Sequence, residues 1–532
     1  MVQVRQRVLI ALAALSLAAL PVLAQKFYPD DPLEREPRPL DVKTAEAQNL
    51  NDYYDFFRNT FWPPDREQIK HHNPLPSEAI NTLGEVPDST WFTNRVGSRP
   101  MTVDELVRGP GTDDPPSTSG PWTVVSGKNQ GVQPGLIIRD ARRKRYFLKF
   151  DPMSYPDMAT AADVIGAKFF YDLGYNTPQN YIVRFPRSRL RVAPQSRYRG
   201  ENGQERQMTE KDIEDVLAKV PRGADGRYRG MASRDVGGDL IGPFRYSGTR
   251  SDDPNDIVRH ERRRDLRGLY VFAAWLNHTD SKSINSMDTI VDEGGVHYIK
   301  HFLIDFGAIL GSDTFEPKSP RAGNVFLFSW KPSAMQFATL GFDVKPWMRL
   351  HYPDLPGAGH FQYEDFDPEH WTSNYPNPAF ELRTPGDLYW AAKKVMAFRD
   401  EDIRAIVATG QYDDARTAEW ISRCLIERRN RIGRAFFAEE LPLDHFAVRG
   451  GRLEFEDLAA EYGFHAPQRY SVAWSVFDNA TGRRTSIPNA TTFQVPAAHA
   501  EYLAARIHSA DPDKTVTVYL RGRQVVGIDR TP

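Results

Sequence analysis

Two short segments of the chain concentrate side chains that could act on a metal ion or a phosphate group. The first segment holds His278, Asp280, Lys282 and Asn285 within eight residues, and the second begins at Asp305, twenty residues after Asn285. Carboxylate and amide oxygens are the hard ligands that Mg²⁺ prefers. A lysine near them can balance negative charge. These residue types therefore suit chemistry on a metal-bound, negatively charged group.

Regular elements are expected on both sides of the first segment. A helix from about Asn255 to Leu276 precedes it, with apolar residues along one face. Behind it, residues 287–291 and 296–304 flank Asp292-Glu-Gly-Gly295, the pattern of a β-hairpin. The segment that begins at Asp305 therefore follows the first one across a hairpin.

A strand and a helix expected upstream carry a second pair of charged residues. Residues 146–150 alternate as in a strand that contains Lys149, and a helix introduced by Pro156-Asp157 contains Asp163. Gly174 supplies the stop signal of this helix. The other strands expected in this region are 122–125, 135–138 and 181–185.

The first segment and Asp305-Phe306-Gly307 together resemble the protein-kinase-like superfamily. They match its H-x-D-x-K-x-x-N catalytic loop and its D-F-G motif position by position. The resemblance implies that Asp280 accepts or orients the proton of the attacking hydroxyl and that Lys282 balances the charge of the transferring phosphoryl group. It implies that Asn285 and Asp305 hold Mg²⁺ or Mn²⁺ beside the phosphates of ATP or another nucleotide.

The resemblance extends upstream with two departures. Lys149 occupies the position of the lysine that holds the non-transferring phosphates, but its helix partner in the superfamily is usually Glu, and the candidate here is the shorter Asp163. Residues Gly127 and Gly131 would belong to the loop that covers the phosphates, although this loop does not match G-x-G-x-x-G.

The resemblance covers about residues 122–437, and it points to an atypical branch of the superfamily. No A-P-E motif follows Gly307, in contrast to eukaryotic-type Ser/Thr kinases. The chain looks more like the spore-coat kinases, the toxin-type HipA kinases and the secreted Golgi kinases. The acceptor class therefore stays open between protein Ser/Thr, a small-molecule hydroxyl and a sugar.

The expected fold class is α+β, a two-lobed kinase-like fold with an extended N-terminal arm and a small all-β C-terminal domain. The arginine-rich stretch 187–206 favours a solvated insertion loop over a nucleic-acid patch, because Tyr198 is its lone aromatic residue. The domains are expected as a signal peptide at 1–24, an arm at 25–120, a first lobe at 121–186, a second lobe at 187–440 and a β-rich domain at 445–532.

Composition and the N-terminus indicate an exported protein. The 532 residues carry a net charge of −2, so the protein as a whole has no positive charge that would attract nucleic acid. Cys424 is the single cysteine of the sequence, which excludes an internal disulfide. Arg5 and Arg7 precede the apolar run Val8–Leu20, the pattern of a bacterial signal peptide. We expect a periplasmic or extracellular bacterial protein without a membrane span in the mature chain.

Three functional classes fit this sequence. The leading one is an exported kinase-like phosphotransferase that uses a metal-bound nucleotide. The second is an inactive pseudokinase-like scaffold of the cell envelope, because ATP is scarce outside the cytoplasm. The third is an AMP transferase on the same fold. Retention of Asp280, Lys282, Asn285 and Asp305 favours an enzyme, since a scaffold needs none of them.

Overall fold

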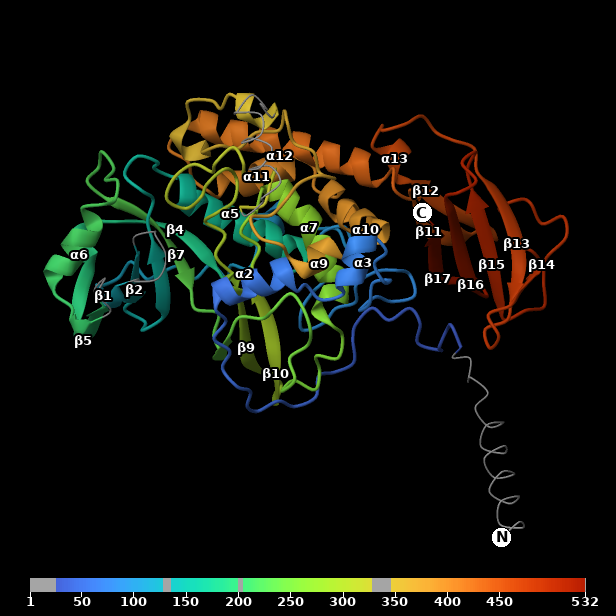
Figure 1. Cartoon of the computed structure of the whole chain (residues 1–532), viewed down its shortest axis with the longest axis horizontal. Helices are drawn as coiled ribbons and strands as arrows, with labels where there is room; N and C mark the ends of the chain where they lie inside the picture. Colours follow the sequence, from blue (N-terminus) through green and yellow to red (C-terminus); the bar gives the residue numbers. More distant parts are fainter. Residues whose placement is uncertain (1–24, 128–134, 200–203, 328–345, 532) are drawn as a thin grey trace, which may run out of the picture. The chain divides into compact units, whose positions relative to one another are not determined.

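The computed structural model describes residues 25–127, 135–199, 204–327 and 346–531, which divide into two compact units (Figure 1). The larger unit comprises residues 34–80 and 85–439. The smaller unit comprises residues 25–33, 81–84 and 440–531. The α+β class is confirmed, because helices and mixed or antiparallel sheets both contribute.

A seven-stranded sheet forms one side of the larger unit, with the strand order β4-β7-β3-β2-β1-β5-β6. All neighbours in this sheet are antiparallel except β1 and β5, which are parallel and place Val124 opposite Val192. The strands are β1 (Trp122–Gly127), β2 (Gly135–Arg139), β3 (Arg145–Lys149), β4 (Asn180–Phe185), β5 (Leu190–Arg199), β6 (Glu205–Gln207) and β7 (Tyr228–Arg234).

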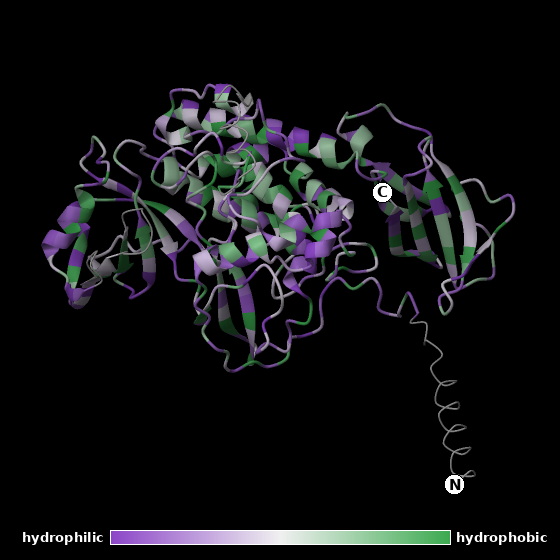
Figure 2. Cartoon of the chain, viewed as in Figure 1, coloured by the Kyte–Doolittle hydropathy of each residue, from purple (hydrophilic) through white to green (hydrophobic). Residues whose placement is uncertain are grey.

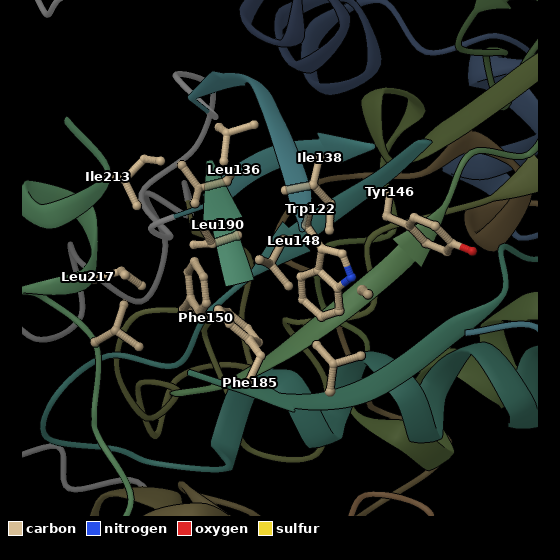
Figure 3. Close-up of a cluster of buried hydrophobic side chains, with 14 of the residues drawn as sticks. Trp122, Leu136, Ile138, Tyr146, Leu148, Phe150, Phe185, Leu190, Ile213 and Leu217 are labelled. Atoms are coloured by element: carbon tan, nitrogen blue, oxygen red, sulfur yellow. The ribbon is translucent and has the colours of Figure 1, made fainter. Parts of the chain in front are cut away.

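Apolar side chains from these strands and from helix α6 (Glu210–Leu217) form a common core (Figure 3). Trp122, Leu148 and Phe150 are fully or almost fully buried, and Phe185 packs against both Trp122 and Phe150. This core fixes the strand that carries Lys149.

The expected loop over residues 187–206 is wrong, because this stretch supplies β5 and β6. Leu190, Ala193 and Ser196 are buried, whereas Arg191 and Arg197 of the same strand are exposed. The arginine content reflects the outer face of a strand. The seven-stranded sheet consequently continues to Arg234, past residue 186, where the sequence placed the end of the first lobe.

Helix α5 (Met158–Leu173) follows β3 and lies almost wholly in the interior. It ends at Gly174, whose φ of 130° is open to glycine and whose site leaves no space for a Cβ beside Phe92. The helix packs against β4 and β7, so it is held to the sheet that contains Lys149.

The helical part of the larger unit is built from α7 (Arg264–Leu276), α10 (Pro385–Met396), α11 (Asp400–Ala408) and α12 (Ala415–Phe436). The last three comprise two shorter helices and one longer helix, and Cys424 of α12 is buried. Hydrophobic residues gather along α5 and α7, whereas α3 (Arg66–His71) is mainly hydrophilic (Figure 2).

Helix α7 begins nine residues later than the sequence predicted. Asn255 lies in a turn and Asp256 in irregular backbone instead, because their side chains bond elsewhere: Asn255 Oδ1 accepts from the backbone N–H of Leu40, and Asp256 pairs with His260. Such local side-chain bonds compete with helix formation. The end of α7 agrees with the prediction, since Asn277 adopts the left-handed conformation directly after Leu276.

A three-stranded sheet with the order β10-β9-β8 connects the two predicted site segments. Strands β9 (Ser286–Glu293) and β10 (Val296–Leu303) form the expected hairpin, and β8 (Asp239–Gly242) pairs with β9. Gly294 and Gly295 turn the hairpin at φ values of 63° and 77°.

The region before the sheet contains the short helices α2 (Asp52–Phe61), α3 and α4 (Val103–Arg108) between extended stretches. Trp91 and Phe92 are buried in the larger unit, and the Trp91 ring stacks on His301 at a centroid distance of 3.5 Å. The part of this segment around Trp91 and Phe92 is therefore packed into the larger unit.

The smaller unit is dominated by an antiparallel sheet with the order β14-β13-β15-β16-β17. Its strands are β13 (Ser471–Phe477), β14 (Arg484–Ser486), β15 (Tyr502–His508), β16 (Thr515–Arg521) and β17 (Gln524–Thr531), and a hairpin of β11 (Leu443–Arg449) and β12 (Arg452–Asp457) accompanies them. Phe27 is fully buried against Phe477, Tyr502 and Tyr519. Within the described parts of both units, every helix is too short or too polar to cross a bilayer.

Candidate active site

Lys149 is the centre of a buried charge cluster. Its Nζ donates to Asp163 Oδ2 at 2.7 Å and to Asp305 Oδ1 at 2.6 Å. Burial alone would lower the pKa of Lys149, but the two carboxylates outweigh it and raise the pKa above its ordinary value. The lysine is therefore a fixed cation, joined to one residue of α5 and one residue of the D-F-G motif.

The shorter carboxylate of Asp163 does reach the lysine. Its position is fixed by two further donors to Oδ1, the side-chain amide of Asn180 at 3.2 Å and the backbone N–H of Phe306 at 3.0 Å. The Asn180 amide also donates to the Asp163 carbonyl at 3.1 Å. Asp163 thus joins three parts of the site: strand β3, strand β4 and the D-F-G segment.

Asp305 and Phe306 are adjacent in the chain but differ in exposure. Asp305 has a φ of 63°, and its side chain is 43% exposed although it contacts Lys149. Phe306 is fully buried and stacks on Phe170 of α5 at 5.0 Å. Gly166 makes room for it, since a Cβ there would lie 2.6 Å from Phe306 Cβ. The packed ring therefore presents the neighbouring carboxylate toward solvent.

A second cluster contains Asp280, Lys282 and Asn285, which the sequence predicted to form a catalytic loop. Asn285 Nδ2 donates to Asp280 Oδ2 at 2.9 Å, and Lys282 Nζ lies 3.1 Å from Asp280 Oδ1. Burial raises the pKa of Asp280, against the opposing effect of Lys282 and Asn285. Burial would lower the pKa of Lys282, but Asp280 and Asp52 raise it. The carboxylate and the cation are held side by side.

The hairpin brings the two clusters together. The backbone N–H of Ile304 donates to the Asn285 carbonyl at 3.0 Å, so the residue before Asp305 is bonded directly to the end of the catalytic loop. His278 is buried at the start of this loop, with its ring centroid 5.6 Å from that of Phe170. Burial lowers the pKa of His278 to about 3, so this imidazole is neutral at physiological pH.

The donor set at this junction fits a divalent cation bound together with phosphates. Asp305 offers a partly exposed carboxylate, and Asn285 directs its amide N–H toward Asp280, which leaves its carbonyl oxygen as the ligand atom. Both are hard oxygens of the kind Mg²⁺ and Mn²⁺ accept. Within the described ranges, no three His, Cys, Asp or Glu side chains gather into a metal site of their own. With two protein ligands, the remaining coordination positions of the cation would be open to water and to phosphate oxygens.

The glycines proposed to cover the phosphates are only partly placed. Gly127 is the buried last residue of β1 and pairs with Leu136 of β2. Gly131 lies outside the described residues. Gly127 therefore marks the entry to the β1–β2 connection, which is the position that the resemblance assigns to a phosphate-covering loop.

Three residues near the site were not singled out by the sequence. Asn180 orients Asp163, Asp52 of α2 pairs with Lys282 at 3.1 Å, and Lys318 donates to Thr279 at 2.7 Å. Each residue reaches the site through contacts between distant parts of the chain, and none of the three belongs to a recognisable sequence motif. Asn180 begins β4, which is separated from the lysine strand β3 by β7, so only the folded chain shows that it reaches Asp163.

Comparisons with known proteins give a distant structural likeness. No family model matches the sequence, and no curated protein matches it. Among solved structures, the crystal structure of the Golgi casein kinase aligns over 77% of this chain and 96% of its own, with 10% identity and a TM-score of 0.29. A structure of the Golgi casein kinase with Mn/ADP bound aligns over 77% and 94%, with the same identity and TM-score. We therefore base the function on the geometry around Lys149 and Asp280.

Proposed function

We propose that this protein is an atypical kinase-like phosphotransferase that moves the terminal phosphoryl group of a metal-bound nucleotide to a hydroxyl acceptor. The observation that carries the proposal is the buried Lys149, which contacts Asp163 and Asp305 at 2.7 and 2.6 Å. A lysine fixed between a helix carboxylate and the D-F-G carboxylate is the arrangement that holds nucleotide phosphates in this chemistry.

The two clusters would divide the work of the reaction. Lys149 would bind the non-transferring phosphates, while Asp305 and Asn285 would hold Mg²⁺ or Mn²⁺. The bound cation would supply charge neutralisation for the phosphate oxygens. Lys282 would balance the charge of the phosphoryl group in transfer. Asp280 would orient the acceptor hydroxyl and take its proton as the oxygen–phosphorus bond forms and the nucleoside diphosphate leaves.

The role proposed for Asp280, which is to take a proton from a hydroxyl group, implies an alcohol as the acceptor. A protein Ser or Thr, a sugar and a small-molecule hydroxyl all meet this requirement. We also propose export to a bacterial periplasm or the extracellular space, supported by Arg5, Arg7 and the apolar run after them. N-terminal sequencing of the protein recovered from the periplasm tests export, and a start at Gln25 is expected.

Thermal stabilisation by ATP with Mg²⁺ or Mn²⁺ tests the nucleotide site. A ligand at 100 times its dissociation constant adds about 2.7 kcal/mol to the free energy of unfolding. We expect metal-dependent stabilisation of the mature protein and its loss in Asp305→Ala. Asp225→Ala, which alters an exposed carboxylate beside Arg227, is the matched control. Equal stabilisation of Asp305→Ala would remove the metal role.

The mass of the product separates the three functional classes. A phosphotransferase adds a phosphate to its acceptor, whereas an AMP transferase adds a nucleotide. A pseudokinase-like scaffold leaves every acceptor unchanged. Mass spectrometry after incubation with ATP, Mn²⁺ and a mixture of casein, free sugars and glycans makes the distinction, with Asp280→Asn as the inactive reference.

A further inference from the structure

The chain after the D-F-G motif folds into a tight loop that returns to the catalytic loop. The backbone N–H of Lys318 donates to the Gly311 carbonyl at 2.8 Å and closes the loop. Inside it, Asp313 N–H donates to the Glu316 carbonyl at 2.8 Å, and Ser312 forms a bridge with Pro317. This loop stands where an activation segment leaves the D-F-G motif, and it ends at a lysine.

Lys318 is a buried cation outside every motif. Its side chain is 2% exposed, its Nζ donates to Thr279 Oγ1 at 2.7 Å, and Asp313 Oδ1 lies 4.0 Å from the Nζ. Burial lowers the pKa of Lys318, against the opposing charges of Asp313 and Asp280. A buried ammonium carries a large desolvation cost, and an apolar side chain would fill the same space without it. Packing alone therefore does not explain why a lysine occupies this position.

Thr279 is the residue directly before Asp280, and it is fully buried. Its hydroxyl accepts the hydrogen bond from Lys318, and its carbonyl accepts one from Asn374 N–H at 2.8 Å. The backbone that carries Asp280 is thus held on two sides by segments that come later in the chain. The contact from Lys318 is the charged one, and the charge of Lys318 also acts on Asp280.

We propose that Lys318 is a positioning residue of the transfer reaction, which fixes the backbone of Asp280 by holding Thr279 and so couples the segment after D-F-G to the catalytic loop. This inference rests on the proposed phosphotransferase function. Lys318 is too deeply buried to touch an acceptor, and its partners Thr279, Asp313, Gly311 and His360 do not belong to the Lys149 cluster. Its loss should therefore affect the chemical step and spare nucleotide binding.

Lys318→Met tests this role beside Lys394→Met. Lys394 is an equally buried lysine of the larger unit that donates to Asn94 and Ser98. Methionine keeps the length of the side chain, and replacing a buried charge by an apolar group often leaves stability unchanged. We expect kcat to fall by about tenfold or more in Lys318→Met, because small misplacements of a reacting group have effects of that size. The nucleotide dissociation constant should stay within about twofold, and Lys394→Met should keep full kcat.

A double-mutant cycle with Thr279→Val asks whether Lys318 acts through Thr279. We expect the double variant to lose no more kcat than Lys318→Met alone, because both changes remove one contact. Additive losses, an unchanged kcat in Lys318→Met, or an equal loss of nucleotide binding would overturn the inference.

Amide hydrogen exchange over residues 278–285 separates this inference from the proposed function. A wild-type protein that transfers nothing to any acceptor would overturn the function alone. Faster exchange of this loop in Lys318→Met than in Lys394→Met is expected in either case. Equal exchange in the two variants would overturn the positioning role.

Discussion

Asp163 lies fourteen residues after Lys149 in the sequence and 2.7 Å from it in space. The aspartate is shorter by one methylene than the glutamate usual at this position, yet the contact is made because α5 is packed tightly onto the sheet. The same carboxylate accepts from Phe306 N–H, so the helix, the lysine and the D-F-G motif form one unit. The predictions below start from this arrangement.

Asp163→Ala should weaken both the fold and the nucleotide site. Removing one partner of a buried ion pair leaves a charge uncompensated, which typically costs 3–5 kcal/mol, and the remaining contact with Asp305 places the expected loss near about 3 kcal/mol. Urea denaturation measures the stability, and ATP–Mn²⁺ stabilisation measures the site. A variant as stable as wild type would show that Asp163 does not support Lys149.

Asp280→Asn should keep nucleotide binding and lose transfer. The amide cannot accept the proton of the acceptor hydroxyl, and general-base catalysis typically contributes about 10²–10⁴-fold to the rate. We expect kcat to fall within that range while the nucleotide dissociation constant stays unchanged. Steady-state kinetics and calorimetry on the same preparation provide both values, and undiminished turnover would contradict the role of Asp280.

Gly166→Ala should disturb the D-F-G segment. A Cβ at this position would lie 2.6 Å from both Phe306 and Ile309, and overpacking of this kind typically costs 1–3 kcal/mol. Gly268→Ala is a matched control in α7, where a Cβ would lie 2.6 Å from Trp390. Both variants should lose stability, but Gly166→Ala alone should lose ATP–Mn²⁺ stabilisation. Loss of binding in both would attribute the effect to general unfolding.

His278 should make the fold sensitive to acid. Its pKa is about 3 in the folded state, lowered by burial from an ordinary value near 6.5. The unfolded chain therefore binds the proton more readily, and stability is lost as the pH falls below about 6.5 toward 3. Relative to His278→Leu, the wild-type protein should lose about 2 kcal/mol between pH 7.5 and pH 5. Denaturation of the wild-type protein and of His278→Leu at both pH values measures this difference.

The sequence predicted the local elements of the site well, because motif spacing and hydrophobic periodicity are local signals. The hairpin between Asn285 and Asp305, the helix of Asp163 and the strand of Lys149 are all found. The β5–β7 strands were missed, since β1 pairs with β5 in parallel across a long stretch of chain. Alternation in a strand whose outer face is rich in arginine resembles a polar loop when its partner is unknown.

Residues whose roles depend on tertiary contacts could not be predicted from the sequence. Lys318 gains its position from a loop closed by Gly311, and Asp52 reaches Lys282 across 230 positions of chain. The hydrophobic periodicity that predicts helices and strands gives no information about contacts between such distant residues. Roles that depend on a contact of this kind can be assigned once the backbone path is known.

The burial of Phe27 in the smaller unit has a consequence for the order of biosynthesis. This unit combines residues near Phe27 and residues 81–84 with the stretch from Glu440 onward, and Thr82 bonds to Val526 and Ile528. The ribosome delivers these pieces more than 350 residues apart. Phe27 and Thr82 therefore lack their partners until the chain has been synthesised as far as Ile528, so the core of the β unit is completed long after its first residues have been made.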